Sequence, residues 1–471
     1  MADQATQPVK RAARLLWALV TALCISTVAF AFFWRLREVP SNITGDEVTY
    51  LNDVLRIIQA PDKVSPLSFM GDGSQSGFNF YPMAWLSRLF SEADAVLAMR
   101  LDSVLIGLGV LAAFYLYVRT KVNFGAAALA TLLLGTNYVF LNFSRATWMG
   151  VGRGAVLILG LLSFYFVERA ARRQQWRWMV LAGVFSGLTL YGYIWAAALP
   201  AASLLYLGYV ALRKRLPWKT ALAYGAVLFS LTALVATPFF LQIRNDYDRY
   251  TLRTKSVFIY DAARPYYGQS DMPGILWHQA TYTVRGFLFL DPGVSTEGVE
   301  NQRYVPRGEG PVDPVTRVLF FASLGAVLLF HRKNIVLPAL ALAGVLLATQ
   351  VLTQVTPNIA RGIFALVFIY VLLAVFLDWL LTSRRYRPWL PAAVTLLALG
   401  LGWWNTWHYF QWGESKELAS SRQPAIQYGQ VPLWVETQKK HIQGGQYDLT
   451  ITSKEWQLLL QTRGNGPGGK D

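Results

Sequence analysis

The stretch that decides the fold is LLWALVTALCISTVAFAFF, residues 15–33, which contains no charged side chain. At about 1.5 Å per residue, a helix of this length crosses a hydrocarbon core about 30 Å thick. Lys10, Arg11 and Arg14 precede it, so the segment resembles the start of a secretory signal peptide. Because the apolar run is long for such a peptide and no small-residue cleavage site follows, we expect a retained membrane span.

Similar apolar runs recur along the whole chain of 471 residues, of which 54% are hydrophobic and only 15% charged. Soluble domains carry about 25% charged residues, so the composition indicates an all-α polytopic membrane protein with about eleven transmembrane helices. The stretch Met179–Leu212 is too long for one span, and Gly192 and Pro200 interrupt it, so we count it as two compact helices. The expected spans are 15–33, 103–118, 125–141, 154–167, 179–193, 195–212, 220–242, 317–330, 335–353, 363–381 and 388–406.

The net charge of +16 has a topological explanation. Basic residues gather in short connections such as Arg169–Arg173 and Arg213–Arg215. The positive-inside rule assigns these connections to the cytosol, together with the N-terminus, and places the long loops and the C-terminal tail outside it. We therefore expect a multi-pass protein of the plasma (inner) membrane, and the charge gives no support for a nucleic-acid partner.

Three segments on the outer side are too long for simple connections. Residues 1–406 are expected to form the transmembrane module, with outer loops at about 34–102 and 243–316, and residues 407–471 an outer tail whose glycine-rich end should be disordered. The second loop interleaves tyrosines with arginines. This mixture suits a sugar or phosphate surface, and equally a lid packed on the bilayer interface.

The first outer loop carries two adjacent acids, Asp46 and Glu47. Thr44 with Glu47 fits a helix capping box, and Pro61 closes the segment. Apolar residues follow at helical spacing, at Val48, Leu51, Leu55 and Ile58. The pattern predicts a short amphipathic helix along the outer interface. Adjacent helical residues point about 100° apart, so one carboxylate should face a reaction centre while the other caps or orients.

The expected spans contain almost no ionisable residues, Asp378 being the main exception. Proton-coupled transporters normally carry such groups in mid-membrane, so this absence moves the chemistry to the interfaces. Arg145, Arg153 and Arg361 stand at the outer ends of spans. A guanidinium there is suited to bind a lipid phosphate through paired hydrogen bonds. The alternative is an arginine that only anchors its helix.

Metal-ligand patterns are absent from the sequence. Cys24 is the single cysteine and lies inside the first span, so it forms no internal disulfide. The four histidines are scattered without metal-ligand spacing. We predict no metal site from these residues.

Several short motifs occur in a characteristic order along the chain. The acidic pair Asp46-Glu47 with Tyr50 is followed by Phe78–Pro82, Ala98–Leu101, Tyr115–Arg119, Ser144-Arg145, Pro357 with Arg361, and Asn405–Phe410. Together with the topology, this series resembles the polyprenyl-phosphate-sugar-dependent glycosyltransferases of the GT-C fold. The resemblance is closest to the bacterial branch of the protein mannosyltransferase and aminoarabinose transferase superfamily (glycosyltransferase family 39-like). It covers most of the first 215 residues well and the remainder loosely.

The resemblance implies roles for individual residues. Asp46 matches the aspartate proposed as the base that activates the acceptor, with Glu47 as its supporting neighbour. Arg145 and Arg361 would hold the lipid phosphate, and Tyr50 and Arg153 complete the expected substrate-binding set. One departure stands out: Ala146–Met149 occupies the place of a second acidic motif. The use of a divalent cation and the type of acceptor therefore stay open.

The predicted function is a membrane hexosyl- or pentosyltransferase. It would move a sugar from a polyprenyl-phosphate donor in the bilayer to a protein, lipid or glycan acceptor on the extracytoplasmic side. Two alternatives from other classes remain: a flippase for lipid-linked saccharides, and a non-catalytic scaffold of an envelope complex.

Overall fold

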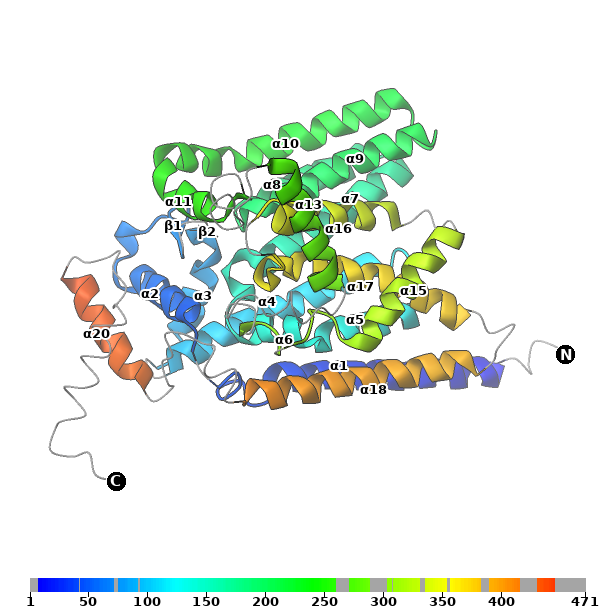
Figure 1. Cartoon of the computed structure of the whole chain (residues 1–471), viewed down its shortest axis with the longest axis horizontal. Coiled ribbons are helices and arrows are strands. Elements are labelled where there is room, and N and C mark those ends of the chain that lie inside the picture. The colour runs from blue at the N-terminus through cyan, green and yellow to red at the C-terminus, as the bar shows by residue number, and fades with distance from the viewer. Residues whose placement is uncertain are drawn as a thin grey trace.

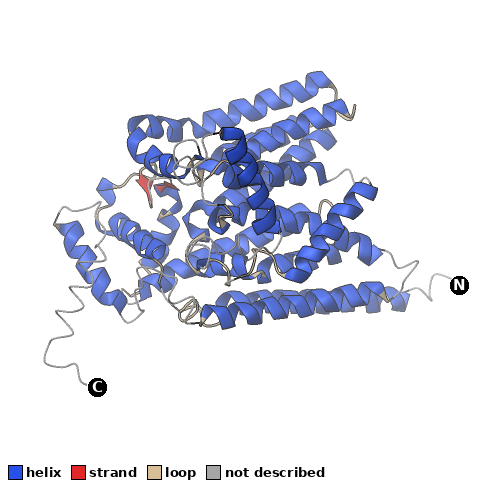
Figure 2. Cartoon of the chain, in the orientation of Figure 1, coloured by secondary structure: helices blue, strands red, loops and turns tan. Residues whose placement is uncertain are grey.

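The computed structural model describes residues 7–41, 43–71, 75–91, 94–259, 271–288, 303–306, 308–330, 335–353, 356–382, 389–415 and 430–444. The glycine-rich end of the tail and part of the Tyr/Arg-rich second loop lie outside these ranges. Almost all of the described chain is helical (Figure 2). Its two short strands, β1 (Phe69–Met70) and β2 (Gln75–Ser76), pair antiparallel with Phe69 opposite Ser76.

The described residues form a long series of helices. In chain order they are α1 (Gln7–Phe33), α2 (Gly45–Gln59), η1 (Pro61–Lys63), η2 (Gly77–Asn79), α3 (Tyr81–Ser87), α4 (Ala95–Val118), α5 (Phe124–Thr136), α6 (Tyr138–Arg145), η4 (Met149–Arg153), α7 (Gly154–Arg173), α8 (Trp176–Thr189), η5 (Ile194–Ala197), α9 (Ala198–Leu212), α10 (Trp218–Asn245), α11 (Tyr247–Val257), α13 (Met272–Thr283), η6 (Val284–Leu288), α15 (Pro314–Phe330), α16 (Val336–Leu346), η9 (Leu347–Val351), α17 (Ile359–Thr382), α18 (Leu390–Gly413) and α20 (Val431–Gln443).

Each of the expected spans overlaps one of these helices. Six helical segments of the described chain are long and apolar enough to cross a membrane, and α5 with α6, bent by 63°, would make a seventh. The protein is therefore an integral membrane protein, while the count of eleven spans stays a prediction. The stretch Met179–Leu212 forms two helices, as expected: α8 ends at Thr189, and η5 leads into α9.

The molecule has two distinct ends along its long axis. α2, α3, the strand pair, α11 and α20 gather at one end, and the start of α1 lies at the other (Figure 1). α1 and α18 run side by side in the same direction, and the Ser41 amide donates to the Gly413 carbonyl at 3.1 Å. α18 thus continues beyond residue 406, where the sequence placed the end of the last span.

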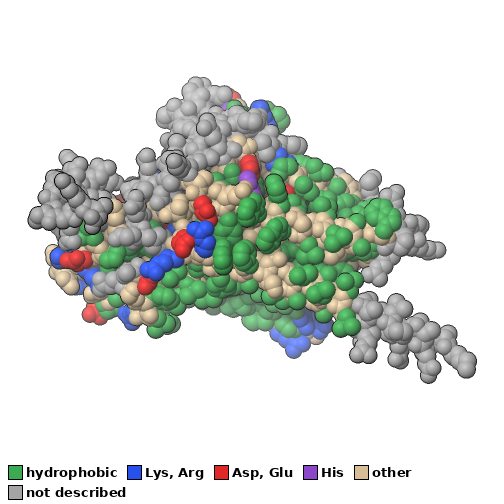
Figure 3. All heavy atoms as spheres, turned by 90° about the horizontal axis from the view of Figure 1, so that it is seen from below, with side chains coloured by type: hydrophobic (Ala, Val, Ile, Leu, Met, Phe, Trp, Pro, Cys, Tyr) green, Lys and Arg blue, Asp and Glu red, His purple; other side chains and the backbone are tan. Residues whose placement is uncertain are grey.

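The α1–α18 face carries an exposed apolar surface. Seen from below, this face is covered largely by hydrophobic side chains (Figure 3). Leu15, Leu19 and Ile25 of α1, with Leu396 and Trp403 of α18, are all more than 45% exposed. Large apolar side chains in such number suit contact with lipid tails rather than water.

Charged residues fasten the helices at the end opposite α2. The Lys121 ammonium group lies 2.6 Å from the Glu168 carboxylate and joins the segment after α4 to α7. Asp378, the acid expected near a span end, accepts from the Asn123 backbone amide at 2.8 Å, at the start of α5. Arg384 and Arg385, which follow it closely in the sequence, lie outside the described residues.

Helix α4 begins earlier than the sequence predicted. Its expected span started at residue 103, whereas the helix starts at Ala95 and contains Arg100 and Asp102, both buried. The expectation of nearly uncharged helices is therefore wrong for α4. The helix accommodates Arg100 because the protein itself supplies a carboxylate partner for it, as described below.

The apolar face of α2 is covered by protein. Val48, Leu51 and Leu55 are each less than 5% exposed, because α3, α4 and α20 pack around the helix. A cavity of about 250 Å³ remains between α2 and α20. A helix from the C-terminal tail therefore covers the apolar face of α2, and the position of α2 along the outer interface stays a prediction.

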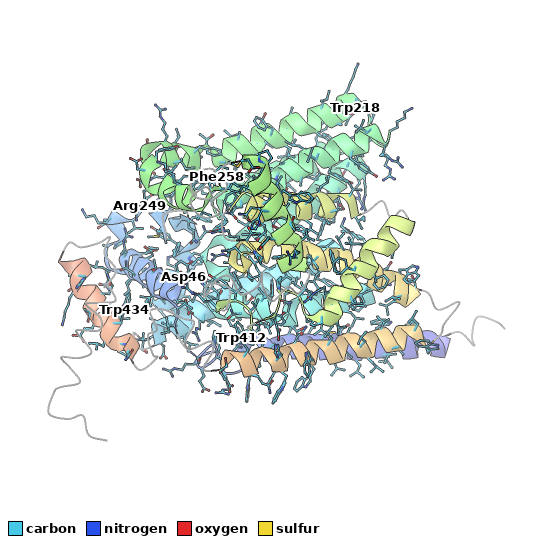
Figure 4. The ribbon with its side chains drawn as sticks, viewed as in Figure 1. Asp46, Trp218, Arg249, Phe258, Trp412 and Trp434 are labelled. Carbon is cyan, nitrogen blue, oxygen red and sulfur yellow. The ribbon has the colours of Figure 1, made fainter. Side chains whose placement is uncertain are left out.

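A truncation in α20 tests this packing. Trp434 is 1% exposed and lies on α20 at the α2 end of the molecule (Figure 4). Trp434→Ala should destabilise the fold by about 3–5 kcal/mol, because it leaves a large cavity. Thermal unfolding in detergent measures the change, with Glu436→Ala on the exposed face as the control. An unchanged melting temperature for Trp434→Ala would show that α20 does not support α2.

Candidate functional site

The start of α2 is fixed by the capping box that the sequence predicted. The Thr44 hydroxyl accepts from the Glu47 amide at 3.1 Å, and the Glu47 carboxylate accepts in return from the Thr44 amide at 2.9 Å. Glu47 is fully buried. These two bonds turn the Glu47 side chain back over the first turn of the helix, away from the exposed surface.

Arg100 of α4 completes this arrangement. Its Nε lies 3.2 Å from the Glu47 carboxylate, and both side chains are 0% exposed. Its Nη1 donates to the carbonyls of Leu36 and Pro40, which follow α1. One buried guanidinium therefore holds the end of the first span, the start of α2 and the body of α4 together.

Asp46 faces a different direction from its neighbour. It is partly exposed, and its Oδ2 accepts a hydrogen bond from the Trp148 indole Nε1 at 3.2 Å. Asp46 lies on α2 at the end of the molecule that also holds Trp434, far from Trp218 at the opposite end (Figure 4). The structure thus separates the acidic pair as helical geometry predicted: Glu47 caps the helix, and Asp46 is presented.

Trp148 stands in a tight turn between α6 and η4. Thr147 has φ +59°, and the Trp148 amide donates to the Ala146 carbonyl at 2.7 Å, which makes a γ-turn. This left-handed conformation costs a β-branched residue about 1–2 kcal/mol. The Ser103 hydroxyl of α4 stabilises the turn by accepting from the amides of Met149 and Gly150 at 3.1 and 3.2 Å.

Aromatic rings enclose the Trp148 indole. The Phe143 ring lies 5.2 Å from it and the Tyr304 ring 4.9 Å, measured between centroids. Tyr304 belongs to the end of the second long loop, which side chains of α6 and α18 attach to the bundle. These attachments are Asn142 to the Arg303 carbonyl, Tyr138 to the Gly310 carbonyl, His408 to Glu309 and Asn405 to Asp313.

Two of the expected substrate-binding residues, Arg153 and Tyr50, lie together beside this turn. The Arg153 guanidinium stacks between the rings of Phe143 and Tyr193, at 5.8 and 5.6 Å, and the Tyr50 hydroxyl is within hydrogen-bonding reach of it. Arg153 is 7% exposed, and its Nε has no hydrogen-bond partner among the described residues. Its Nη1 also donates a long bond of 3.4 Å to the Trp148 carbonyl. This guanidinium retains capacity for an anion.

The sequence led us to expect that Arg145 binds the lipid phosphate. In the structure its guanidinium binds backbone carbonyls of the protein. It is fully buried, and its two terminal nitrogens donate to the carbonyls of Ala31, Phe32, Trp34 and Val39 at 2.7–2.9 Å. These carbonyls belong to the last turn of α1 and the segment after it, which a helix leaves without internal partners. Arg145 therefore closes the end of the first span.

Arg361 lies near the start of α17. Its amide donates to the Asn358 side chain at 3.1 Å, and its side chain is 7% exposed. Its assignment to the phosphate remains a prediction.

Sequence reasoning missed three residues of this region. Trp148 and Arg100 were not singled out, although each contacts one member of the acidic pair. Asp53 was also missed: it accepts from the Gly71 amide at 2.6 Å and from Arg56 at 3.0 Å, and burial raises its pKa to about 6. Asp53 thus ties the strand pair to α2. Arg100 lies in the motif Ala98–Leu101 and Trp148 in the segment Ala146–Met149, but the motifs assigned neither residue a role.

Metal ligands do not cluster in the described part of the chain, where no three His, Cys, Asp or Glu side chains gather as a ligand set. The indole beside Asp46 is a hydrogen-bond donor and has no lone pair to offer a cation.

Comparisons with known proteins show similarity in both sequence and fold. Residues 80–239 match the family model described as dolichyl-phosphate-mannose-protein mannosyltransferase. The fold is similar to that of the oligosaccharyltransferase AglB from Archaeoglobus fulgidus in complex with an inhibitory peptide and a dolichol-phosphate. That comparison has a TM-score of 0.53 at 14% identity and covers 87% of this chain and 56% of AglB. A structure of the Archaeoglobus fulgidus oligosaccharyltransferase with Zn and sulfate is also similar, with a TM-score of 0.54 at 13% identity. That comparison covers 84% of this chain and 53% of the oligosaccharyltransferase.

The chain has the GT-C fold. This confirms the resemblance that the motifs indicated, although the chain spans only about half the length of these oligosaccharyltransferases. ArnT from Cupriavidus metallidurans bound to undecaprenyl phosphate is also similar, with a TM-score of 0.47 at 15% identity, covering 89% of this chain and 76% of ArnT. A search of curated protein sequences finds no significant match.

The buried ion pair gives Glu47 a structural role that Asp46 lacks, and substitutions of the two acids test this difference. Glu47→Gln should destabilise the protein by about 3–5 kcal/mol, because it leaves the Arg100 charge buried without a counter-charge. Asp46→Asn, at a partly exposed position, should change the melting temperature little. Thermal unfolding of both variants in the same detergent measures the two changes in stability. Equal losses of stability would contradict the division of roles.

Proposed function

We propose that this protein is a membrane glycosyltransferase that transfers a sugar from a polyprenyl-phosphate donor to an acceptor on the extracytoplasmic side. The observation that carries the proposal is the partly exposed carboxylate of Asp46, which accepts a hydrogen bond from the Trp148 indole. In a GT-C fold, Trp148 contacts both Asp46 and Arg153, and the Arg153 Nε has no hydrogen-bond partner among the described residues. The family match to a dolichyl-phosphate-mannose-protein mannosyltransferase and the fold shared with a dolichol-phosphate-bound enzyme support a lipid-linked donor.

The chemistry is displacement at the anomeric carbon of the sugar. Asp46 takes a proton from the acceptor as the acceptor atom bonds to that carbon. The bond between the anomeric carbon and the phosphate oxygen breaks, and its electron pair leaves with the lipid phosphate. Arg153 provides fixed positive charge for this leaving group, with Tyr50 beside it.

The side of the membrane follows from charge. The basic connections predict that the ends opposite α2 face the cytosol, so Asp46 would face outward. A donor that arrives through the bilayer requires no nucleotide-sugar domain, and the predicted site lies at the end of the bundle where the outer loops gather (Figure 1).

Asp46→Asn tests the base directly. General-base catalysis contributes about 10²–10⁴-fold, so the variant should lose transfer by that factor while it unfolds at the wild-type temperature. Transfer is measured in proteoliposomes with a radiolabelled polyprenyl-phosphate sugar, using membranes of the native host as the acceptor source. Asp62→Asn, an exposed acid in the same outer loop, is the matched control. Full activity of Asp46→Asn would remove Asp46 as the base.

The same assay separates this function from the two alternatives. A flippase would move the labelled lipid across the bilayer and leave its glycosidic bond intact. A scaffold would show neither transport nor transfer, and Asp46→Asn would leave its partner complexes unchanged.

A pair of arginine substitutions tests the phosphate site. Lysine cannot reproduce the planar fork of arginine. Arg153→Lys should lower kcat/KM for the donor by about 10²–10³-fold, the size of effect seen when one fixed donor to a developing anion is lost. Arg145→Lys should mainly lower the melting temperature, because Arg145 serves four carbonyls. The reverse result would exchange the roles of the two residues.

A further inference from the structure

We infer that Trp148 is a positioning residue for Asp46: its indole N–H fixes the direction of the carboxylate and favours the ionised form that accepts the proton. This inference rests on the proposed function, because it assigns Trp148 a role in the transfer reaction. Trp148 lies in Ala146–Met149, the segment where the resemblance led us to expect a second acidic motif.

The first argument is the rigidity of the indole. Trp148 is 0% exposed, and the rings of Phe143 and Tyr304 lie within 5.2 and 4.9 Å of it. A tryptophan has only two side-chain torsions, and packing of this kind leaves neither free to rotate. Its Nε1 therefore points at Asp46 before any substrate arrives.

The second argument is the backbone that carries the indole. Thr147, the preceding residue, has φ +59°, and its hydroxyl is buried without a hydrogen-bond partner among the described residues. Strained residues of this kind persist where the surrounding structure enforces them, and they cluster at functional sites. Here Ser103 enforces the turn through the two amides that follow Trp148. The strained turn therefore directs the Trp148 side chain toward Asp46.

The third argument is the chemistry of the donor. An indole N–H donates and cannot accept, so it cannot compete with Asp46 for the acceptor proton. A hydrogen bond to the charged form of a carboxylate stabilises that form, whereas a second carboxylate nearby would favour protonation. The replacement of an expected acid by an indole therefore keeps Asp46 ready to act as a base at lower pH.

The decisive variant is Trp148→Phe, which keeps an aromatic ring and removes the N–H. We expect kcat to fall at least tenfold, KM for the polyprenyl-phosphate sugar to stay within twofold, and the acid limb of the pH–rate profile to move to higher pH. The isosteric benzothienylalanine at position 148, which replaces the N–H by sulfur, should behave in the same way. It decides the question if Trp148→Phe fails to fold.

Trp412→Phe is the matched control. Trp412 is 4% exposed on α18, and its Nε1 has no hydrogen-bond partner among the described residues, so the substitution removes a buried N–H that makes no such bond (Figure 4). It should leave both kcat and the pH profile unchanged.

Two outcomes separate failure of this inference from failure of the proposed function. If Asp46→Asn is inactive while both Trp148 variants keep the wild-type kcat and acid limb, the base stands and the role of Trp148 is overturned. If Asp46→Asn keeps full activity, the proposed function fails first. A uniform loss of kcat in the Trp148 variants with an unmoved acid limb would also overturn the inference, because a purely structural role predicts that result.

Discussion

The buried ion pair between Glu47 and Arg100 is the constraint on which the rest of the site depends. Two charges without solvent exposure are stable only if each finds its partner in place. Arg100 also holds the carbonyls of Leu36 and Pro40, so the chain must leave the first span along one path. Glu47 therefore has a structural role as the helix cap and the partner of Arg100. Asp46 points about 100° away from it around the helix and faces outward.

Three distant parts of the sequence then meet around Trp148. The first loop supplies Asp46 and Tyr50, the turn between α6 and η4 supplies Trp148, and the start of α7 is preceded by Arg153. The end of the second long loop adds Tyr304, and α18 attaches this segment through the contacts of His408 with Glu309 and Asn405 with Asp313. A helix near the end of the chain therefore stabilises the position of a ring that packs against the partner of Asp46.

The sequence predicted the features that depend on local pattern or bulk composition. The capping box of Thr44 and Glu47, the division of the acidic pair and the two helices within Met179–Leu212 all follow from spacing and helix geometry, and the structure confirms them. The GT-C fold followed from an ordered series of short motifs.

The features that the sequence did not predict arise from contacts between remote segments. A prediction from hydropathy ends a span at a charged residue such as Arg100. The helix itself continues through Arg100, because Glu47 is a buried partner for its charge. An amphipathic face such as that of α2 looks the same whether lipid or α20 covers it. Position at a span end cannot distinguish Arg145, whose terminal nitrogens bind four carbonyls, from Arg153, whose Nη1 makes a long bond of 3.4 Å to one. These distinctions depend on where each side chain points, which spacing along one helix does not specify.

The most direct test of the account is an experimental structure of the protein in a lipid nanodisc with bound undecaprenyl phosphate. We expect the phosphate to lie against the Arg153 guanidinium, on the side of the turn that carries Trp148 and Asp46, with Arg145 still bonded to the carbonyls that end α1. A phosphate held by Arg145, or bound at the opposite end of the bundle near Lys121, would contradict it.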